Sequence, residues 1–272
     1  MFFNFLKKKS KTNSNVKEEF LKNNTFEINL SEGKVNYSQL NNIYIHRNSN
    51  NEIDVSNLTM CNVTALVQSL AYNGWKFPEG KFNQPEDNLA KFILESEIVR
   101  DYYKKQMPIL YKDWIDGKKG SYPPNEIHSI LAFGVNKWIG QDVDTFKENA
   151  KIWDITNEIL EGRSCVISGA FPTVKGGTLN HIVSLVGGIW KFDKNITKKE
   201  AIKKIINEKI CPDFYIIDDT YAYWNTLIKQ YEYDKNGDNV KLSYQDFINY
   251  MKPQSNNFVK YCHFLKSGAE IV

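Results

Sequence analysis

The 272-residue sequence is poor in cysteine and histidine, with four of each. The cysteines are far apart and none belongs to a CxxC pair, so the ligand spacing of a structural zinc site is missing. A chain of this length does not need disulfides to build a core, and so few cysteines favour a reducing compartment. The sequence therefore predicts neither a metal site nor a disulfide framework. The four thiols belong to Cys61, Cys165, Cys211 and Cys262.

A strong charge of one sign and a long apolar run are also missing. The formal net charge is +3 and the isoelectric point is near 8.4, too weak a bias to predict nucleic-acid binding. The apolar start of the chain is shorter than the apolar core of about 7–15 residues in a secretory signal, and its lysines follow instead of preceding it. We expect no signal peptide, no transmembrane span and synthesis in the cytoplasm.

Residues 1–24 are rich in lysine, asparagine and serine, which predicts a flexible polar leader. A basic and aromatic tail of this kind can alternatively touch an anionic membrane surface. The remaining residues, 25–272, have the length and composition of a single domain, with 42% apolar, 25% charged and 14% aromatic residues.

Helical patterns dominate the first half of the chain and strand patterns the second. Residues 35–42 are expected to be extended, and a hairpin turn is expected between Tyr233 and Val240. Helices are expected at 61–73, 86–107, from Pro123 onward, 143–161, 197–209 and from Ser243; strands are expected at 165–168, 182–186 and 214–217. This division predicts an α+β fold in which a helical lobe faces an antiparallel sheet lobe.

The segment from Met60 to Gly74 places Cys61 where a loop becomes a helix. Val63, Leu66 and Leu70 recur at helical spacing and predict one apolar stripe. A thiol in the first turn of a helix lies at the positive end of the helix dipole, which favours the nucleophilic thiolate. The sequence of this segment is equally compatible with a buried cysteine that only packs in the core.

A nucleophilic cysteine needs a base, and His181 is the best placed of the four histidines. It opens a strand directly after a loop that contains Gly176 and Gly177, which leave room for a substrate backbone. A histidine that merely begins a strand would show the same pattern. The strand at 214–217 ends in Asp218 and Asp219, either of which could orient the imidazole if the two strands pair. An aspartate pair is also common in turns.

At this point the sequence resembles papain-like cysteine peptidases related to the bacteriocin-leader-processing domains of peptide exporters. The closer likeness is to the stand-alone branch of bacterial and phage proteins. Four blocks occur in the order of that family and extend over about residues 34–252: they are residues 37–42, 61–64, 162–183 and 219–224. The first resembles a Ser-Gln-x-Asp-Asn block, and the last resembles an Asp-Pro-Tyr-Gly-x-Trp block.

The resemblance implies a papain-like fold with an active-site cleft between the two lobes. It also implies roles for single residues: Cys61 as nucleophile, His181 as base, Asp219 as orienting acid and Gln39 in the oxyanion hole. The register of Trp224 favours Asp219 over Asp218. The chain departs from the family where Thr220 replaces a proline, Ala222 a glycine and Asn41 an aspartate, and an insertion at 47–57 separates Gln39 from Cys61.

Two further patterns are set aside. Residues 234–239 resemble the start of a calcium-binding EF-hand loop, but Asn239 and Gln245 stand where such a loop needs glycine and glutamate. His263 follows Cys262, yet adjacent residues of a strand point to opposite faces, so these two do not predict a second thiol site.

The resemblance implies peptidoglycan peptide bonds as the substrate and a bacterial or phage setting, with no metal or organic cofactor. Without an export signal, such an enzyme would need a holin-type route or carriage in a phage particle. The alternatives are a peptidase that cuts proteins or leader peptides, and a relative that binds a peptide without cutting it. The sequence does not predict the oligomeric state.

Overall fold

The computed structural model describes residues 19–172, 178–251 and 258–268. Its main element is a seven-stranded sheet with the order β10-β7-β6-β5-β11-β4, in which β1 pairs with β6. All of these pairings are antiparallel. The strands are β1 Thr25–Asn29, β4 Asp144–Lys151, β5 Cys165–Pro172, β6 Thr178–Lys191, β7 Phe214–Asp219, β10 Gly237–Ser243 and β11 Phe258–Leu265.

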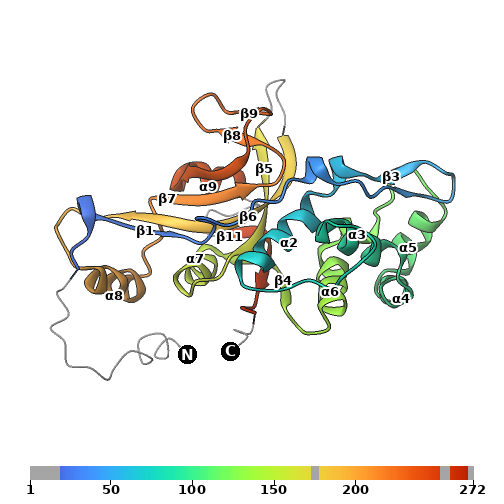
Figure 1. Ribbon diagram of the computed structural model, residues 1–272, viewed down its shortest axis with the longest axis horizontal. Coiled ribbons are helices and arrows are strands. Elements are labelled where there is room, and N and C mark those ends of the chain that lie inside the picture. Colours follow the sequence, from blue (N-terminus) through green and yellow to red (C-terminus); the bar gives the residue numbers. More distant parts are fainter. Residues whose placement is uncertain (1–18, 173–177, 252–257, 269–272) are drawn as a thin grey trace.

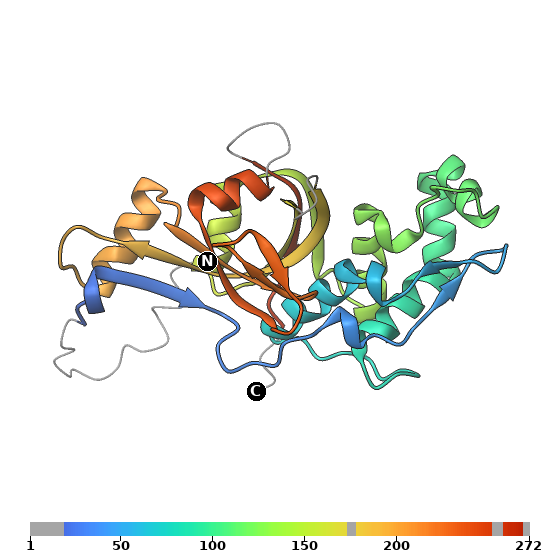
Figure 2. The same cartoon turned by 90° about the horizontal axis from the view of Figure 1, so that it is seen from above.

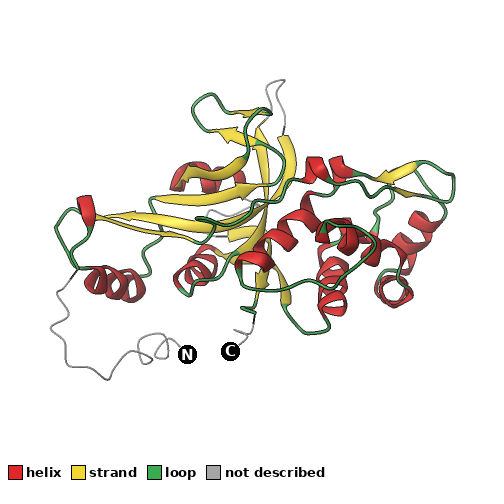
Figure 3. Ribbon diagram, viewed as in Figure 1, coloured by secondary structure: helices red, strands yellow, loops and turns green. Residues whose placement is uncertain are grey.

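The helices form two groups around this sheet (Figures 1 and 2). One group gathers at one end of the molecule: α2 Cys61–Tyr72, α3 Pro85–Glu95, α4 Glu97–Gln106, α5 Pro108–Ile115 and α6 His128–Ile139. The other lies among the strands: α7 Ile152–Leu160, α8 Lys198–Glu208 and α9 Tyr244–Met251. Five of the described α-helices thus gather at one end of the antiparallel sheet and three lie beside its strands (Figure 3), an arrangement consistent with the α+β prediction.

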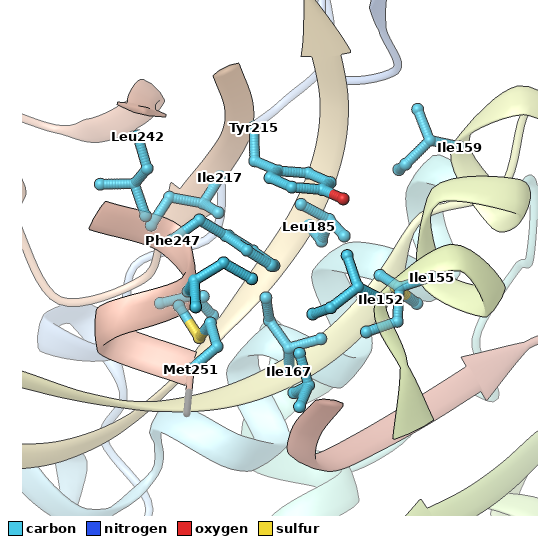
Figure 4. Packing of buried hydrophobic residues seen from close by; sticks show 14 of the residues in the cluster. Ile152, Ile155, Ile159, Ile167, Leu185, Tyr215, Ile217, Leu242, Phe247 and Met251 are labelled. Atoms are coloured by element: carbon cyan, nitrogen blue, oxygen red, sulfur yellow. The ribbon is translucent and has the colours of Figure 1, made fainter. Parts of the chain in front are cut away.

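Each face of the sheet supports its own core. Figure 4 shows Ile155 of α7 and Phe247 of α9 packed against Ile167 and neighbouring strand residues. The opposite face contributes Val166 and Ile182 to a second core with the helical group. Successive residues of one strand, such as Val166 and Ile167, therefore enter different cores, as the two-residue period of a strand requires.

Helix α2 lies between the helical group and the sheet, where it packs on β6. It is buried almost all round, so the prediction of a single apolar stripe was too narrow. Its buried polar side chains have partners: Thr64 donates to the carbonyl of Met60, and Gln68 accepts from the backbone N–H of Tyr37. These hydrogen bonds offset the cost of burying polar groups and fix the helix that begins at Cys61.

The predicted strands at 165–168, 182–186 and 214–217 and the helices at 61–73 and 197–209 are present. The helix expected from Ser243 is also present, and Ser243 Oγ accepts from the backbone N–H of Asp246 at its first turn. Pro124 begins a 3-10 helix, Pro124–Glu126, and α6 follows it.

Three predicted elements were wrong in kind or extent. The single helix over 86–107 is two helices, because Ser96 between α3 and α4 has extended backbone angles. The first half of the helix expected at 143–161 is strand β4, which pairs with β11. The extended segment 35–42 contains a 3-10 helix, Gln39–Asn41, whose N-terminal Ser38 accepts from the N–H of Leu40.

The hairpin predicted between Tyr233 and Val240 is wrong: the chain does turn there, from β9 to β10, but in the described part of the chain these two strands do not pair with each other. Instead, β8 (Tyr223–Asn225) and β9 (Gln230–Glu232) form a separate two-stranded sheet, and β10 pairs with β7. The insertion at 47–57 likewise holds a small sheet of β2 (His46–Arg47) and β3 (Ile53–Val55), followed by a 3-10 helix, Asn57–Thr59.

Within the segment expected as a leader, residues 1–18 lie outside the described residues. Phe20 forms a bridge with Thr197, and a 3-10 helix, Lys22–Asn24, leads into β1. Across the described ranges of the chain, every helix is too short or too polar to cross a lipid bilayer.

Candidate active site

Cys61 is the first residue of α2, at the point where the helix enters from the Asn57–Thr59 turn. Ser56 and Thr59 form a capping box that fixes this turn. No side chain caps the start of α2, since the residue before Cys61 is methionine. The Cys61 side chain is partly exposed, whereas Cys165 and Cys262 are buried in the core.

His181 lies on β6 opposite Gly169 of β5, and only 4% of its surface is exposed. Its Nε2 atom is 2.6 Å from Oδ1 of Asp219, and Cys61 is near enough to influence the pKa of the ring. Because Asp219 engages Nε2, Nδ1 is the nitrogen left for the sulfur. Burial lowers the pKa of His181, but the charge and hydrogen bond of Asp219 and the contact with Cys61 outweigh burial and raise it to about 10.

Asp219 ends β7 and is fully enclosed by donors. Oδ1 accepts from His181 and from the backbone N–H of Tyr221 at 2.8 Å. Oδ2 accepts from the hydroxyl of Tyr231 at 2.9 Å. Tyr231 was not among the residues singled out in the sequence, because it belongs to none of the four blocks; its only signal is the density of aromatic residues between 221 and 233.

Asp218 contacts other residues than Asp219 does, because the side chains of adjacent strand residues point to opposite faces of the sheet. It accepts from the hydroxyl of Tyr72, the last residue of α2, at 2.9 Å and from the backbone N–H of Asn239 at 2.7 Å. Asp218 thus ties the far end of the Cys61 helix to the sheet. The structure brings Asp219, and not Asp218, to the imidazole.

Gln39 is 2% exposed, and three hydrogen bonds, besides the one that its carbonyl accepts within the 3-10 turn, hold it. Its backbone N–H donates to the carbonyl of Thr220 at 2.8 Å, and its Oε1 accepts from the hydroxyl of Thr220 at 3.2 Å. Its Nε2 donates to the carbonyl of Asn57, at 3.2 Å, in the turn that precedes Cys61. An amide nitrogen carries two hydrogens, so one donor remains for a ligand.

Thr220, where the resembled family has proline, therefore has a structural task. Its hydroxyl donates a hydrogen bond to Oε1 of the Gln39 amide. This contact directs Nε2 of the amide toward the turn that precedes Cys61. Proline has no hydroxyl and could not do this. Gly176 and Gly177, expected to leave room beside His181, lie outside the described residues.

Two of the other three histidines, His46 and His263, also contact acids, and neither contact involves a cysteine. His46 Nδ1 is 2.7 Å from Asp54, and His263 Nδ1 is 2.8 Å from Asp144. His263 and Cys262 face opposite sides of β11. The second nitrogen of His263 lies 3.0 Å from His128 Nδ1, and burial, then His263, lowers the pKa of His128 to about 3. Over the part of the chain that the structure describes, no cluster of acids, histidines and cysteines could hold a metal ion.

Among the described residues, cavities at the surface include a larger and a smaller one. The larger, about 470 Å³, is lined by Trp153 and Phe264, which belong to α7 and β11. The smaller, about 90 Å³, adjoins the site because Asp219 itself lines it together with Leu40, Tyr221 and Tyr233.

No family model matches the sequence, and no curated protein matches it either. Among solved structures, the chain is similar to a protein from Bacillus anthracis described as a C39-like peptidase. The two share 14% identity over 90% of this chain and 100% of the other, with a TM-score of 0.43. At that level the similarity assigns neither a family nor an activity, so the functional argument rests on the side chains above.

Proposed function

We propose that the protein is a papain-like cysteine peptidase. The observation that carries this proposal is the 2.6 Å contact between the imidazole of His181 and Asp219, with Cys61 near that imidazole at the start of α2. In this mechanism the Cys61 sulfur attacks an amide carbonyl while His181 holds the thiol proton. His181 then gives that proton to the leaving amine, and water hydrolyses the thioester. Asp219 fixes the tautomer and stabilises the imidazolium.

Negative charge develops on the carbonyl oxygen during the attack, and hydrogen-bond donors must stabilise it. The free hydrogen of Gln39 Nε2 and the backbone N–H of Cys61 are the donors in this proposal. The N–H of Cys61 is available because the first four N–H groups of an α-helix have no partner within the helix. Gln39 is held from both ends, so its donor is in place before substrate binds.

Gln39→Ala is expected to lower kcat by roughly 10²–10³-fold, the usual effect of losing one oxyanion donor. The matched variant Gln39→Glu keeps an oxygen for Thr220 but has no amide hydrogen, and it should lose a similar factor. Steady-state kinetics on a cleaved peptide measure both. Full activity in both variants would remove Gln39 from the mechanism.

Iodoacetamide at neutral pH is expected to alkylate Cys61 before the other cysteines. Cys61 is accessible and next to a base, whereas burial raises the pKa of Cys211 and of Cys262, and Cys165 is buried. Peptide mapping by mass spectrometry follows each site over time, with Cys61→Ser as the control. Equal rates at all four thiols would argue for an inert Cys61.

As substrate we propose the peptide cross-links or stems of peptidoglycan, as the resemblance implies. Cytoplasmic synthesis would then be followed by release through a holin-type route or by carriage in a phage particle. The alternatives are cleavage of a protein or leader peptide, and peptide binding without cleavage. Exposed apolar side chains around the site, Leu40, Leu58 and Tyr233, favour a polypeptide with apolar residues as the second candidate.

Incubation with purified cell walls and, separately, with unfolded proteins distinguishes these substrates. Mass spectrometry of the released fragments identifies the bond that is cut. Wall peptides released by the wild type and not by Cys61→Ala would support the first candidate. Clipped polypeptide without wall fragments would favour the second, and no cleavage of either would favour the binding protein.

A further inference from the structure

Tyr231 approaches the site from outside the main sheet. It lies on β9, in the β8–β9 hairpin, which pairs with no strand of the seven-stranded sheet. Its hydroxyl nevertheless reaches inward to within 2.9 Å of Oδ2 of Asp219. The hairpin thus supplies one side chain to a carboxylate that belongs to β7.

This hydroxyl is the one donor that Oδ2 has among the described residues. The other oxygen, Oδ1, is shared by His181 and the N–H of Tyr221. A carboxylate held at one oxygen only can still rotate about its bond to Cβ, and rotation would carry Oδ1 away from the imidazole. The second contact, from the opposite side, blocks that rotation.

Packing fixes the position of the Tyr231 ring. Its centroid is 5.0 Å from that of the buried Trp224, 5.5 Å from Tyr221 and 6.3 Å from His181, and its ring is nearly perpendicular to the imidazole. Aromatic contacts of this edge-to-face kind hold a ring in one orientation. Burial, and then the charge of Asp219, raises the pKa of Tyr231, so its oxygen keeps its hydrogen and remains a donor.

We propose that Tyr231 is a positioning residue of the active site: by holding Oδ2 of Asp219, it fixes the plane of the carboxylate and thereby the orientation of His181. It acts through Asp219 and need not touch the substrate. This inference rests on the proposed peptidase activity, because the step it serves is proton transfer by His181.

Tyr231→Phe tests the proposal, since phenylalanine keeps the ring contacts and removes only the hydroxyl. We expect kcat to fall about tenfold, as for the loss of a hydrogen bond to a charged group, with KM unchanged. Tyr223→Phe is the matched control: it lies on the same hairpin, and its hydroxyl has no hydrogen-bond partner in the described ranges. This control should keep the wild-type kcat.

A second readout does not depend on turnover. The hydrogen between His181 Nε2 and Asp219, which are 2.6 Å apart, should give a far-downfield proton resonance that disappears in His181→Ala. In Tyr231→Phe this resonance should move upfield or broaden, because the carboxylate is no longer fixed. In Tyr223→Phe it should stay in place.

The two readouts separate this inference from the proposed function. A wild type that cleaves no peptide would overturn the peptidase, while the resonance would still report whether Tyr231 positions Asp219. A fall in kcat with an unchanged resonance would overturn the positioning role, because Tyr231 would then act by another route. An unchanged kcat in Tyr231→Phe with an active wild type would also overturn it.

Discussion

Cys61→Ala is expected to abolish hydrolysis, with kcat reduced by roughly 10⁴–10⁶-fold, because no other group can form the covalent intermediate. His181 would remain beside Asp219 but would have no thiol to deprotonate. The fold should survive, since Cys61 is the partly exposed first residue of α2 and the buried contacts of that helix begin at Asn62. Initial rates on the identified substrate, with circular dichroism and a thermal melt, measure both effects.

Cys211→Ala is the matched control for this variant. Cys211 is also partly buried, and its sulfur contacts the hydroxyl of Thr156 and not a base. Its loss should leave kcat unchanged. Undiminished hydrolysis in Cys61→Ala, or equal losses in both variants, would contradict a nucleophilic Cys61.

Much of the architecture could be predicted from local sequence. The buried strands at 165–168 and 214–217 are short runs rich in branched and aromatic residues, a pattern that few other elements show. The helix from Cys61 was predicted from its spacing, but its burial on all sides was not, because the sheet that covers it lies more than a hundred residues further along the chain.

The errors fell where distant contacts decide the structure. Strand β4 has a sequence with few apolar residues, and what makes it a strand is its pairing with β11 near the end of the chain. No glycine or proline in the sequence indicates that the helix breaks at Ser96. Such features depend on tertiary packing, which overrides local propensity.

The active site likewise has features that local sequence predicts and features that only distant contacts determine. The sequence blocks contain Cys61, His181 and Asp219. The register of Trp224 favours Asp219 over Asp218, and the structure then shows Asp219 facing the imidazole while Asp218 faces Tyr72. The sequence blocks could not predict Tyr231 as part of the site, because it lies on the β8–β9 hairpin and no motif in the sequence indicates where that hairpin packs. Thr220 stands where the resembled family has proline, and the structure shows that its hydroxyl orients Gln39.

Asp219→Asn is expected to lower kcat by roughly 10²–10⁴-fold and to move the alkaline limit of activity to lower pH. Asparagine can still accept from Nε2, so the geometry is retained and only the charge is lost. The pKa of His181, about 10 with Asp219 present, should then fall. Burial lowers this pKa, and asparagine has no negative charge to raise it again. The pH profile of kcat/KM measures this shift.

The same change should alter the pH dependence of stability. A histidine whose pKa is raised on folding stabilises the folded state fully below its unfolded pKa of about 6.5, and this contribution is lost as pH rises toward its folded pKa. The wild type should therefore lose free energy of unfolding between about pH 6.5 and the folded value of about 10, and Asp219→Asn should lose less over that interval. Chemical denaturation at several pH values measures the difference.

Asp218→Asn is the control for both measurements. Asp218 is a buried acid on the same strand, but it accepts from Tyr72 and Asn239 and does not reach the imidazole. The variant should keep the alkaline limit of the wild type, even if it is less stable. If Asp218→Asn moved that limit and Asp219→Asn did not, the two aspartates would have to exchange roles, and the contact between His181 and Asp219 would no longer account for the chemistry.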